Sequence, residues 1–187
     1  MGIAKVIAVF GLSGVGKSTT LQQVVAESGG LAIVMNAGAL IGRRKQNKGS
    51  DENLRLLPTK EIQHNQEILI EELARERKSI GAQVLLLDGH CVIDNGDRLV
   101  PIPIEVIKKL DLAALVFVQE EVERIRERRL RDEKRSRPNL SVAELAKQQK
   151  KALEVCSVYA SVLGLPLTIV TVEQWQLIAE LVDEIAS

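Results

Sequence analysis

The chain has 187 residues, with 25 lysines and arginines against 25 aspartates and glutamates, so its formal net charge is zero. This length suits one domain with a complete hydrophobic core and room for a small insert. A neutral chain is a poor candidate for general nucleic-acid binding, which draws its affinity from excess positive charge. Apolar residues make up 45% of the chain but aromatic residues only 2%, which also disfavours a base-stacking platform.

The predicted strands are five apolar runs, in chain order residues 3–10, 31–35, 84–87, 112–118 and 167–172. Helical patterns separate them at residues 17–27, 59–80, about 120–134, 141–163 and 175–185. Parallel strands need long crossover connections, and these are usually helices. The alternation therefore predicts an α/β fold, with a parallel sheet covered by helices on both faces.

The loop after the first predicted strand reads Gly-Leu-Ser-Gly-Val-Gly-Lys-Ser and fits the P-loop pattern G-x-x-x-x-G-K-S. Glycines let successive backbone N–H groups point at phosphate oxygens, and the following helix adds its positive N-terminal end. Lys17 is expected to reach the β- and γ-phosphates of ATP, and Ser18 to bind Mg²⁺. The predicted nucleotide-binding residues are Gly11, Ser13, Gly14, Val15, Gly16, Lys17, Ser18 and Thr19.

Asp88 and His90 follow the third predicted strand. Ligands of an open α/β sheet bind at the carboxyl ends of its strands, which places both side chains near the P-loop. Asp88 is expected to bind Mg²⁺ through water or to take a proton from an acceptor group. A turn-capping aspartate and a structural histidine are the alternatives. His90 is counted as a candidate substrate-binding residue.

The segment 124–137 is rich in arginine, and Arg124, Arg128, Arg131 and Arg135 share one face of the predicted helix. Interleaved glutamates leave two interpretations open. One is a solvated helix with ion pairs between successive turns. The other is a lid whose arginines clamp bound phosphates.

The order of several segments resembles the archaeal-type adenylate kinases over most of the chain. The P-loop is followed by Val-Met-Asn-Ala-Gly at 34–38, by Arg-Leu-Leu-Pro at 55–58 and by Leu-Asp-Gly-His at 87–90. An Arg-Arg-Leu-Arg-Asp-Glu segment at 128–133 then leads to Arg135 and Arg137. The resemblance implies a P-loop NTPase fold with a five-stranded parallel sheet in one domain. It also implies an acceptor-binding region at about 36–80 and a lid at about 124–142.

The same resemblance implies transfer of a phosphoryl group from Mg·ATP to a nucleoside monophosphate, typically AMP. Lys17, Asp88, Arg129 and Arg135 would then be the catalytic residues, with Ser18 and Asp88 holding Mg²⁺. Arg55 would contact the acceptor's phosphate, and Asn36 and Gly38 would begin the acceptor region. The family also often forms trimers, so a homo-oligomer is expected.

Other interpretations remain open from the residues. The basic stretch with Arg43, Arg44, Lys45 and Lys48 leaves room for an acceptor other than AMP if it borders the acceptor site. A kinase of a small metabolite hydroxyl, as in shikimate-type kinases, would use Asp88 as the base. A nucleotide-sensing regulatory module would bind ATP without transferring phosphate to an acceptor.

The cysteine count and the apolar runs bear on compartment. Two cysteines at unrelated spacing make neither a disulfide framework nor a zinc site. No apolar run approaches the length of a transmembrane helix, and the N-terminus lacks a secretory pattern. We therefore expect a cytoplasmic protein that binds small phosphorylated molecules and has no membrane partner.

Overall fold

A computed structural model of the chain describes residues 2–45, 59–94, 99–132 and 139–187. Its centre is a five-stranded sheet in the order β2-β3-β1-β6-β7, and every neighbouring pair is parallel. The strands are β1 (Lys5–Phe10), β2 (Ala32–Asn36), β3 (Val84–Asp88), β6 (Leu112–Gln119) and β7 (Leu167–Thr171). The predicted five-stranded parallel sheet is confirmed.

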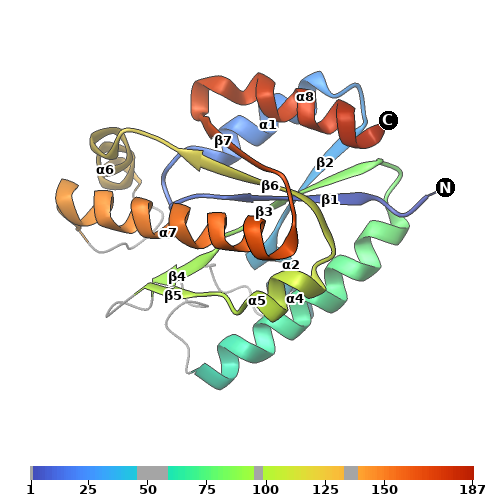
Figure 1. Cartoon of the computed structure of the whole chain (residues 1–187), viewed down its shortest axis with the longest axis horizontal. Helices are drawn as coiled ribbons and strands as arrows, with labels where there is room; N and C mark the ends of the chain where they lie inside the picture. Colours follow the sequence, from blue (N-terminus) through green and yellow to red (C-terminus); the bar gives the residue numbers. More distant parts are fainter. Residues whose placement is uncertain (1, 46–58, 95–98, 133–138) are drawn as a thin grey trace.

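Helices cover both faces of this sheet, as the alternating pattern predicts. The helices α1 (Lys17–Glu27) and α8 (Trp175–Ala186) lie on one face. The helices α4 (Thr59–Ser79), α5 (Ile104–Lys109) and α7 (Val142–Leu163) lie on the other (Figure 1). Two further helices, α2 (Ala37–Lys45) and α6 (Val122–Arg131), follow β2 and β6 at the carboxyl end of the sheet.

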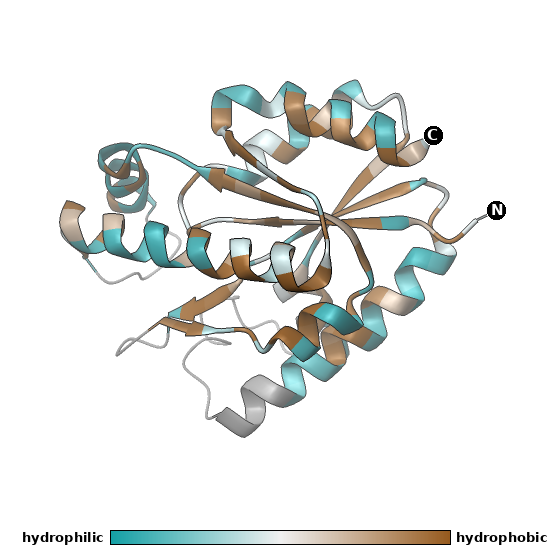
Figure 2. Ribbon diagram, viewed as in Figure 1, coloured by the Kyte–Doolittle hydropathy of each residue, from teal (hydrophilic) through white to brown (hydrophobic). Residues whose placement is uncertain are grey.

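The core is aliphatic, and the central strands supply most of it. All five residues of β3 are buried, and so are the last five of β1. Strands covered on both faces carry continuous apolar runs, which is why these two stand out in the sequence. Figure 2 shows the central strands as hydrophobic ribbon, with hydrophilic residues concentrated on the surrounding helices. On α4, Leu69 and Leu73 are buried as well.

The ends of α7 have clear local causes. The Ser141 side chain accepts a hydrogen bond from the Glu144 backbone N–H, and the Glu144 carboxylate accepts one from the Ser141 backbone. This capping box satisfies N–H groups that the first helical turn leaves unpaired. Gly164 follows the helix in the left-handed region, with φ of 65°, a conformation that favours glycine at helix ends.

Strands β4 (Val92–Asp94) and β5 (Leu99–Pro101) and helices α2 and α5 were not expected from the sequence. The two strands form an antiparallel pair, and each is too short to show an alternating pattern. Helix α5 has six residues, and α2 contains two glycines, so helical periodicity is weak in both. The arginine-rich helix α6 begins at Val122 and ends at Arg131, two residues later and three residues earlier than expected.

Candidate active site

The structure contains a cavity of about 600 Å³ among the residues that it describes. The P-loop and the ends of β2 and β3 border it, as do α2, α4, α5, α6 and the β4–β5 pair. Because the sheet is parallel, the carboxyl ends of its strands meet at this edge, as expected for a ligand site of an open α/β sheet. Eleven predicted site residues line the cavity: Ser13, Gly14, Gly16, Lys17, Ser18, Thr19, Asn36, Gly38, Asp88, His90 and Arg129.

The P-loop depends on glycine at three positions. Gly14 and Gly16 have φ values of 84° and 110°, which side chains other than glycine rarely adopt. At Gly11, a Cβ atom would lie 2.5 Å from the carbonyl oxygen of Val118 on β6. The first glycine therefore allows the chain leaving β1 to pass close to β6, and the other two allow the loop to curl.

Lys17 lies inside this loop and is only 6% exposed. Its Nζ donates to the Gly11 carbonyl oxygen at 3.0 Å and lies 3.8 Å from Asp88 Oδ1. The ammonium group is thus held between loop carbonyls and a buried carboxylate. This position is consistent with the predicted role on the β- and γ-phosphates.

Asp88 ends β3 and is brought to the P-loop by the register of the sheet. It pairs with Val9 on β1 and with Asn36 on β2. Its Oδ2 accepts hydrogen bonds from Ser18 Oγ and Asn36 Nδ2, each at 3.5 Å. Ser18 and Asn36, which are distant from each other and from Asp88 in the sequence, therefore meet at one carboxylate. Asn36 also caps α2, because its Oδ1 accepts the Ala39 backbone N–H at 2.9 Å.

The donor set around Asp88 fits Mg²⁺. Mg²⁺ binds oxygen ligands, retains several waters, and is usually held by one or two protein groups together with substrate phosphates. The Ser18 hydroxyl and the Asp88 carboxylate both line the cavity and lie within 3.5 Å of each other. Within the described ranges, no group of three or more histidine, cysteine or acidic side chains could hold a metal without a ligand. A metal bound jointly with nucleotide phosphates matches this arrangement.

His90 also contacts the P-loop, at Gly11. Its Nδ1 lies 2.9 Å from the Gly11 carbonyl oxygen, which requires the proton on Nδ1 if this contact is a hydrogen bond. The same carbonyl accepts the Lys17 ammonium group. His90 therefore supports the loop directly while its side chain lines the cavity.

Two arginines of α6 reach the P-loop. Arg128 Nη1 donates to the Val15 carbonyl oxygen at 2.6 Å, and its Nη2 donates to Glu120 Oε2 at 3.0 Å. Arg129 Nε donates to the Ser13 carbonyl oxygen at 2.8 Å. Both guanidinium groups line the cavity, so phosphates held by the loop would lie near them.

Arg124 and Arg131 of α6 form surface ion pairs. Arg131 lies 3.6 Å from Glu127, and Arg124 lies 3.3 Å from Glu121 and 3.4 Å from Glu173. Glu121 is the main cause of the raised pKa of Arg124. The ion-pair interpretation therefore applies to Arg124 and Arg131, whereas Arg128 and Arg129 contact the P-loop and their role in a phosphate-clamping lid stays a prediction. Spacing places Arg124, Arg128 and Arg131 on one face, but only Arg128 of these three reaches the loop.

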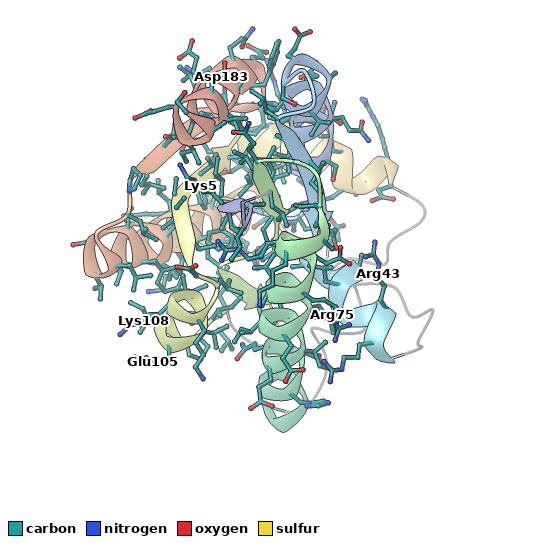
Figure 3. The ribbon with its side chains drawn as sticks, turned by 90° about the vertical axis from the view of Figure 1, so that its right-hand side faces the viewer. Lys5, Arg43, Arg75, Glu105, Lys108 and Asp183 are labelled. Atoms are coloured by element: carbon teal, nitrogen blue, oxygen red, sulfur yellow. The ribbon has the colours of Figure 1, made fainter. Side chains whose placement is uncertain are left out.

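Basic residues of α2 pack against α4 instead of lining the cavity. Arg43 pairs with Glu76 at 3.0 Å, and Arg44 pairs with Glu71 and Glu72. In Figure 3, Arg43 is labelled beside the long helix α4. Neither arginine is among the described residues that line the cavity. The Lys45 side chain and Lys48 lie outside the described residues, as do the predicted site residues Arg55 and Arg135.

Six polar residues that line the cavity were missed as site candidates: Asn65, Gln66, Asp94, Arg128, Asp132 and Gln148. Gln148 on α7 donates to Asp94 on β4 at 3.1 Å, so this contact joins two elements that enclose the cavity. A sequence signal existed for Asn65 and Gln66, because two adjacent carboxamides interrupt the apolar side of α4. None existed for Asp94, whose strand was not predicted.

Comparison with known proteins identifies the family. A family model described as an AAA domain matches residues 10–146. An adenylate kinase of Thermococcus kodakarensis is 31% identical over 151 residues, which cover 77% of this chain and 74% of that protein. An adenylate kinase of Methanothermobacter thermautotrophicus is 29% identical over 170 residues, which cover 89% of each chain.

A structural neighbour shows the fold alone. A shikimate kinase from Bacteroides thetaiotaomicron superimposes with a TM-score of 0.57 at 19% identity, covering 96% of this chain and 98% of that one. No helix within the described ranges is long and apolar enough to cross a membrane.

A domain match over most of the chain, together with a relative 31% identical across three quarters of it, shows that the chain belongs to the archaeal-type adenylate kinase family of P-loop kinases.

Proposed function

We propose that this protein transfers the γ-phosphoryl group of Mg·ATP to a nucleoside monophosphate, and that AMP is the preferred acceptor. The observation that carries the proposal is the division of the cavity. One part is bordered by the P-loop, Asp88 and two arginines, and suits phosphates. The remainder is bordered largely by apolar side chains of α4, α5 and the β4–β5 pair, and suits a nucleobase.

Phosphoryl transfer needs positioning and charge stabilisation more than covalent chemistry from the protein. Loop N–H groups and the Lys17 ammonium group stabilise the β- and γ-phosphates of the donor. Arg129, with Arg128 beside it, stabilises charge on the transferred group. Ser18 and Asp88 would hold Mg²⁺, which would supply charge neutralisation on the donor phosphates. A phosphate oxygen of the acceptor is already deprotonated at neutral pH, so the acceptor needs no strong base.

Two segments keep proposed roles. Residues of about 36–80 form the acceptor-binding region, with Asn36, Gly38 and His90 bordering the cavity. Residues of about 124–142 form the lid, and α6 is its described part. Arg55 and Arg135 are proposed to contact the acceptor's phosphate and the transferred phosphoryl group, and both lie outside the described residues.

A hydroxyl-bearing metabolite is the second candidate acceptor, because the shikimate kinase fold is similar along nearly the whole chain. If this acceptor carries a carboxylate, its site needs a positively charged side chain that binds the carboxylate and does not bind the donor phosphates. Among the described residues that line the cavity, the lysine and arginines are Lys17, Arg128 and Arg129, and each donates to a P-loop carbonyl. The described apolar part therefore favours a nucleobase over a carboxylate.

The test is an acceptor screen with Mg·ATP. ADP formation is measured with AMP, GMP, CMP and UMP, and with shikimate as a hydroxyl acceptor. We expect AMP to give the highest kcat/KM. Lys17→Met should lower kcat by at least about a hundredfold, because one phosphate-stabilising donor is lost. Turnover with shikimate but with no nucleoside monophosphate would reject the proposal, as would ATP consumption that no acceptor accelerates.

A further inference from the structure

Two adjacent carboxamides of α4, Asn65 and Gln66, lie in the cavity wall although both residues are buried, at 5% and 8% exposed. The Oδ1 atom of Asn65 has no hydrogen-bond partner in the described part of the chain. Buried polar groups are nearly always paired, because an unpaired one costs free energy without compensation. An unpaired acceptor in the wall of a cavity is explained by a ligand that supplies the missing donor.

The surroundings of Asn65 restrict the kind of ligand. Leu69 lies one helical turn further along α4 and lines the same cavity, as do Val106 and Ile107 of α5 and Leu110, which follows that helix. Apolar walls with neutral carboxamides do not compensate the charge of a phosphate or carboxylate. They suit a flat, uncharged group with hydrogen-bonding atoms along one edge, as in a nucleobase.

The carboxamide further restricts the edge that it can bind. Its oxygen accepts and its nitrogen donates, so it matches a ligand edge with an amino group beside an unprotonated ring nitrogen. Adenine presents this pair, and asparagine binds it through two hydrogen bonds. The Oδ1 atom is buried here although the residue borders the cavity, so binding a ligand through Oδ1 would require the side chain to change rotamer.

We propose that Asn65 is the residue that selects the acceptor's base, by hydrogen-bonding the amino edge of a 6-aminopurine. Gln66 borders the same site. The inference rests on the proposed function and adds the residue that would make AMP the preferred acceptor, through the exocyclic amino group of its purine.

The experiment pairs a substrate change with a residue change. Values of kcat/KM are measured with AMP and with purine riboside 5′-monophosphate, which lacks the 6-amino group, for the unaltered protein and for Asn65→Leu. The unaltered protein should prefer AMP by about ten- to a hundredfold, the range expected for a pair of hydrogen bonds. Asn65→Leu should lose this preference to within about threefold, mainly through a higher KM for AMP, while the KM for ATP stays unchanged.

Stability gives an independent readout. Asn65→Leu should melt at the same temperature as the unaltered protein or higher, because it removes an unpaired buried acceptor. Gln148→Leu is the matched control, since it removes a carboxamide that also lines the cavity but donates to Asp94, and it should melt lower. Asn65→Ala carries the same kinetic expectation if the leucine variant does not fold.

The outcomes separate two failures. If the unaltered protein uses AMP but Asn65→Leu keeps its preference for AMP, the assignment of Asn65 is wrong and the kinase activity stands. An unaltered protein that uses both acceptors equally well leads to the same conclusion. If no nucleoside monophosphate is phosphorylated at all, the proposed function fails and this inference fails with it.

Discussion

The buried carboxylate of Glu120 links the sheet to the P-loop, and Glu120→Gln tests this link. The Glu120 side chain is 6% exposed and lies 3.0 Å from Arg128, whose other nitrogen donates to the Val15 carbonyl oxygen. Gln149 holds the Glu120 backbone on both sides, accepting from its N–H and donating to its carbonyl. The carboxylate therefore has a fixed position from which it orients Arg128 on the loop.

The cost of the change follows from this burial. Two charges about 4 Å apart attract by about 4 kcal/mol at an effective dielectric constant near 20. The Arg128 side chain is 40% exposed and the new amide oxygen still accepts a hydrogen bond, and both reduce the loss. We expect Glu120→Gln to cost about 1 to 2 kcal/mol, or about 2 to 8 °C in Tm for a chain of this size.

The control is Glu127→Gln on the same helix, where Glu127 and Arg131 are 64% and 81% exposed. An exposed pair four residues apart contributes only about 0.3 to 0.5 kcal/mol. Tm is measured by calorimetry for both variants, for Arg128→Gln, and for the Glu120→Gln/Arg128→Gln double variant. Losses that are equal for Glu120→Gln and Glu127→Gln, or strictly additive in the double variant, would refute the link.

Three further predictions concern parts of the fold outside this link. Gly11→Ala should lower the free energy of unfolding in urea by more than about 2 kcal/mol, because the new Cβ atom would lie 2.5 Å from a β6 carbonyl oxygen. Gly81→Ala is the control and should be nearly neutral, because no atom lies within 4 Å of its new Cβ. The hydrogen bond from the Ser141 hydroxyl is the main cause of the lowered pKa of Glu144. The stabilising contribution of the Glu144 carboxylate should therefore be complete above about pH 4.5 and be lost as the pH falls through the lower pKa of the folded state. The difference in Tm between the unaltered protein and Glu144→Gln should disappear at that low pH, and a difference that persists would contradict the capping role. Burial raises the pKa of the Cys91 thiol to about 12 and also raises the pKa of the Cys156 thiol. A disulfide reagent at pH 8 should therefore react promptly with both thiols only in denaturant. Prompt labelling of the native protein would contradict their burial.

The sequence predicted the parts of the site whose positions follow from neighbouring residues in the chain. The P-loop is contiguous, and Asp88 ends a fully apolar strand, so both could be placed at the carboxyl edge of a parallel sheet without coordinates. The contact between Asn36 and Asp88 needs the register of β2 against β3, which no local pattern gives.

Other features depend on packing between distant elements. Helical spacing puts Arg124 and Arg128 on one face, but only the docking angle of α6 decides which of them reaches the P-loop. The basic stretch with Arg43 was considered as a possible border of the acceptor site, but Arg43 pairs with Glu76 on α4 instead. This contact could not be predicted, because α2 and α4 come together only in the folded chain. The orphaned oxygen of Asn65 likewise becomes visible only when its neighbours in space are known.

The central claim is that the γ-phosphoryl group moves from ATP to a nucleoside monophosphate. The most direct measurement follows that group, with γ-labelled ATP, Mg²⁺ and unlabelled AMP incubated with the unaltered protein and with Lys17→Met. We predict that the label appears in the β-phosphate of ADP in the unaltered sample and is at least about a hundredfold slower to do so in the variant. Label that remains in ATP, or that appears only in inorganic phosphate whether or not AMP is present, would contradict the claim.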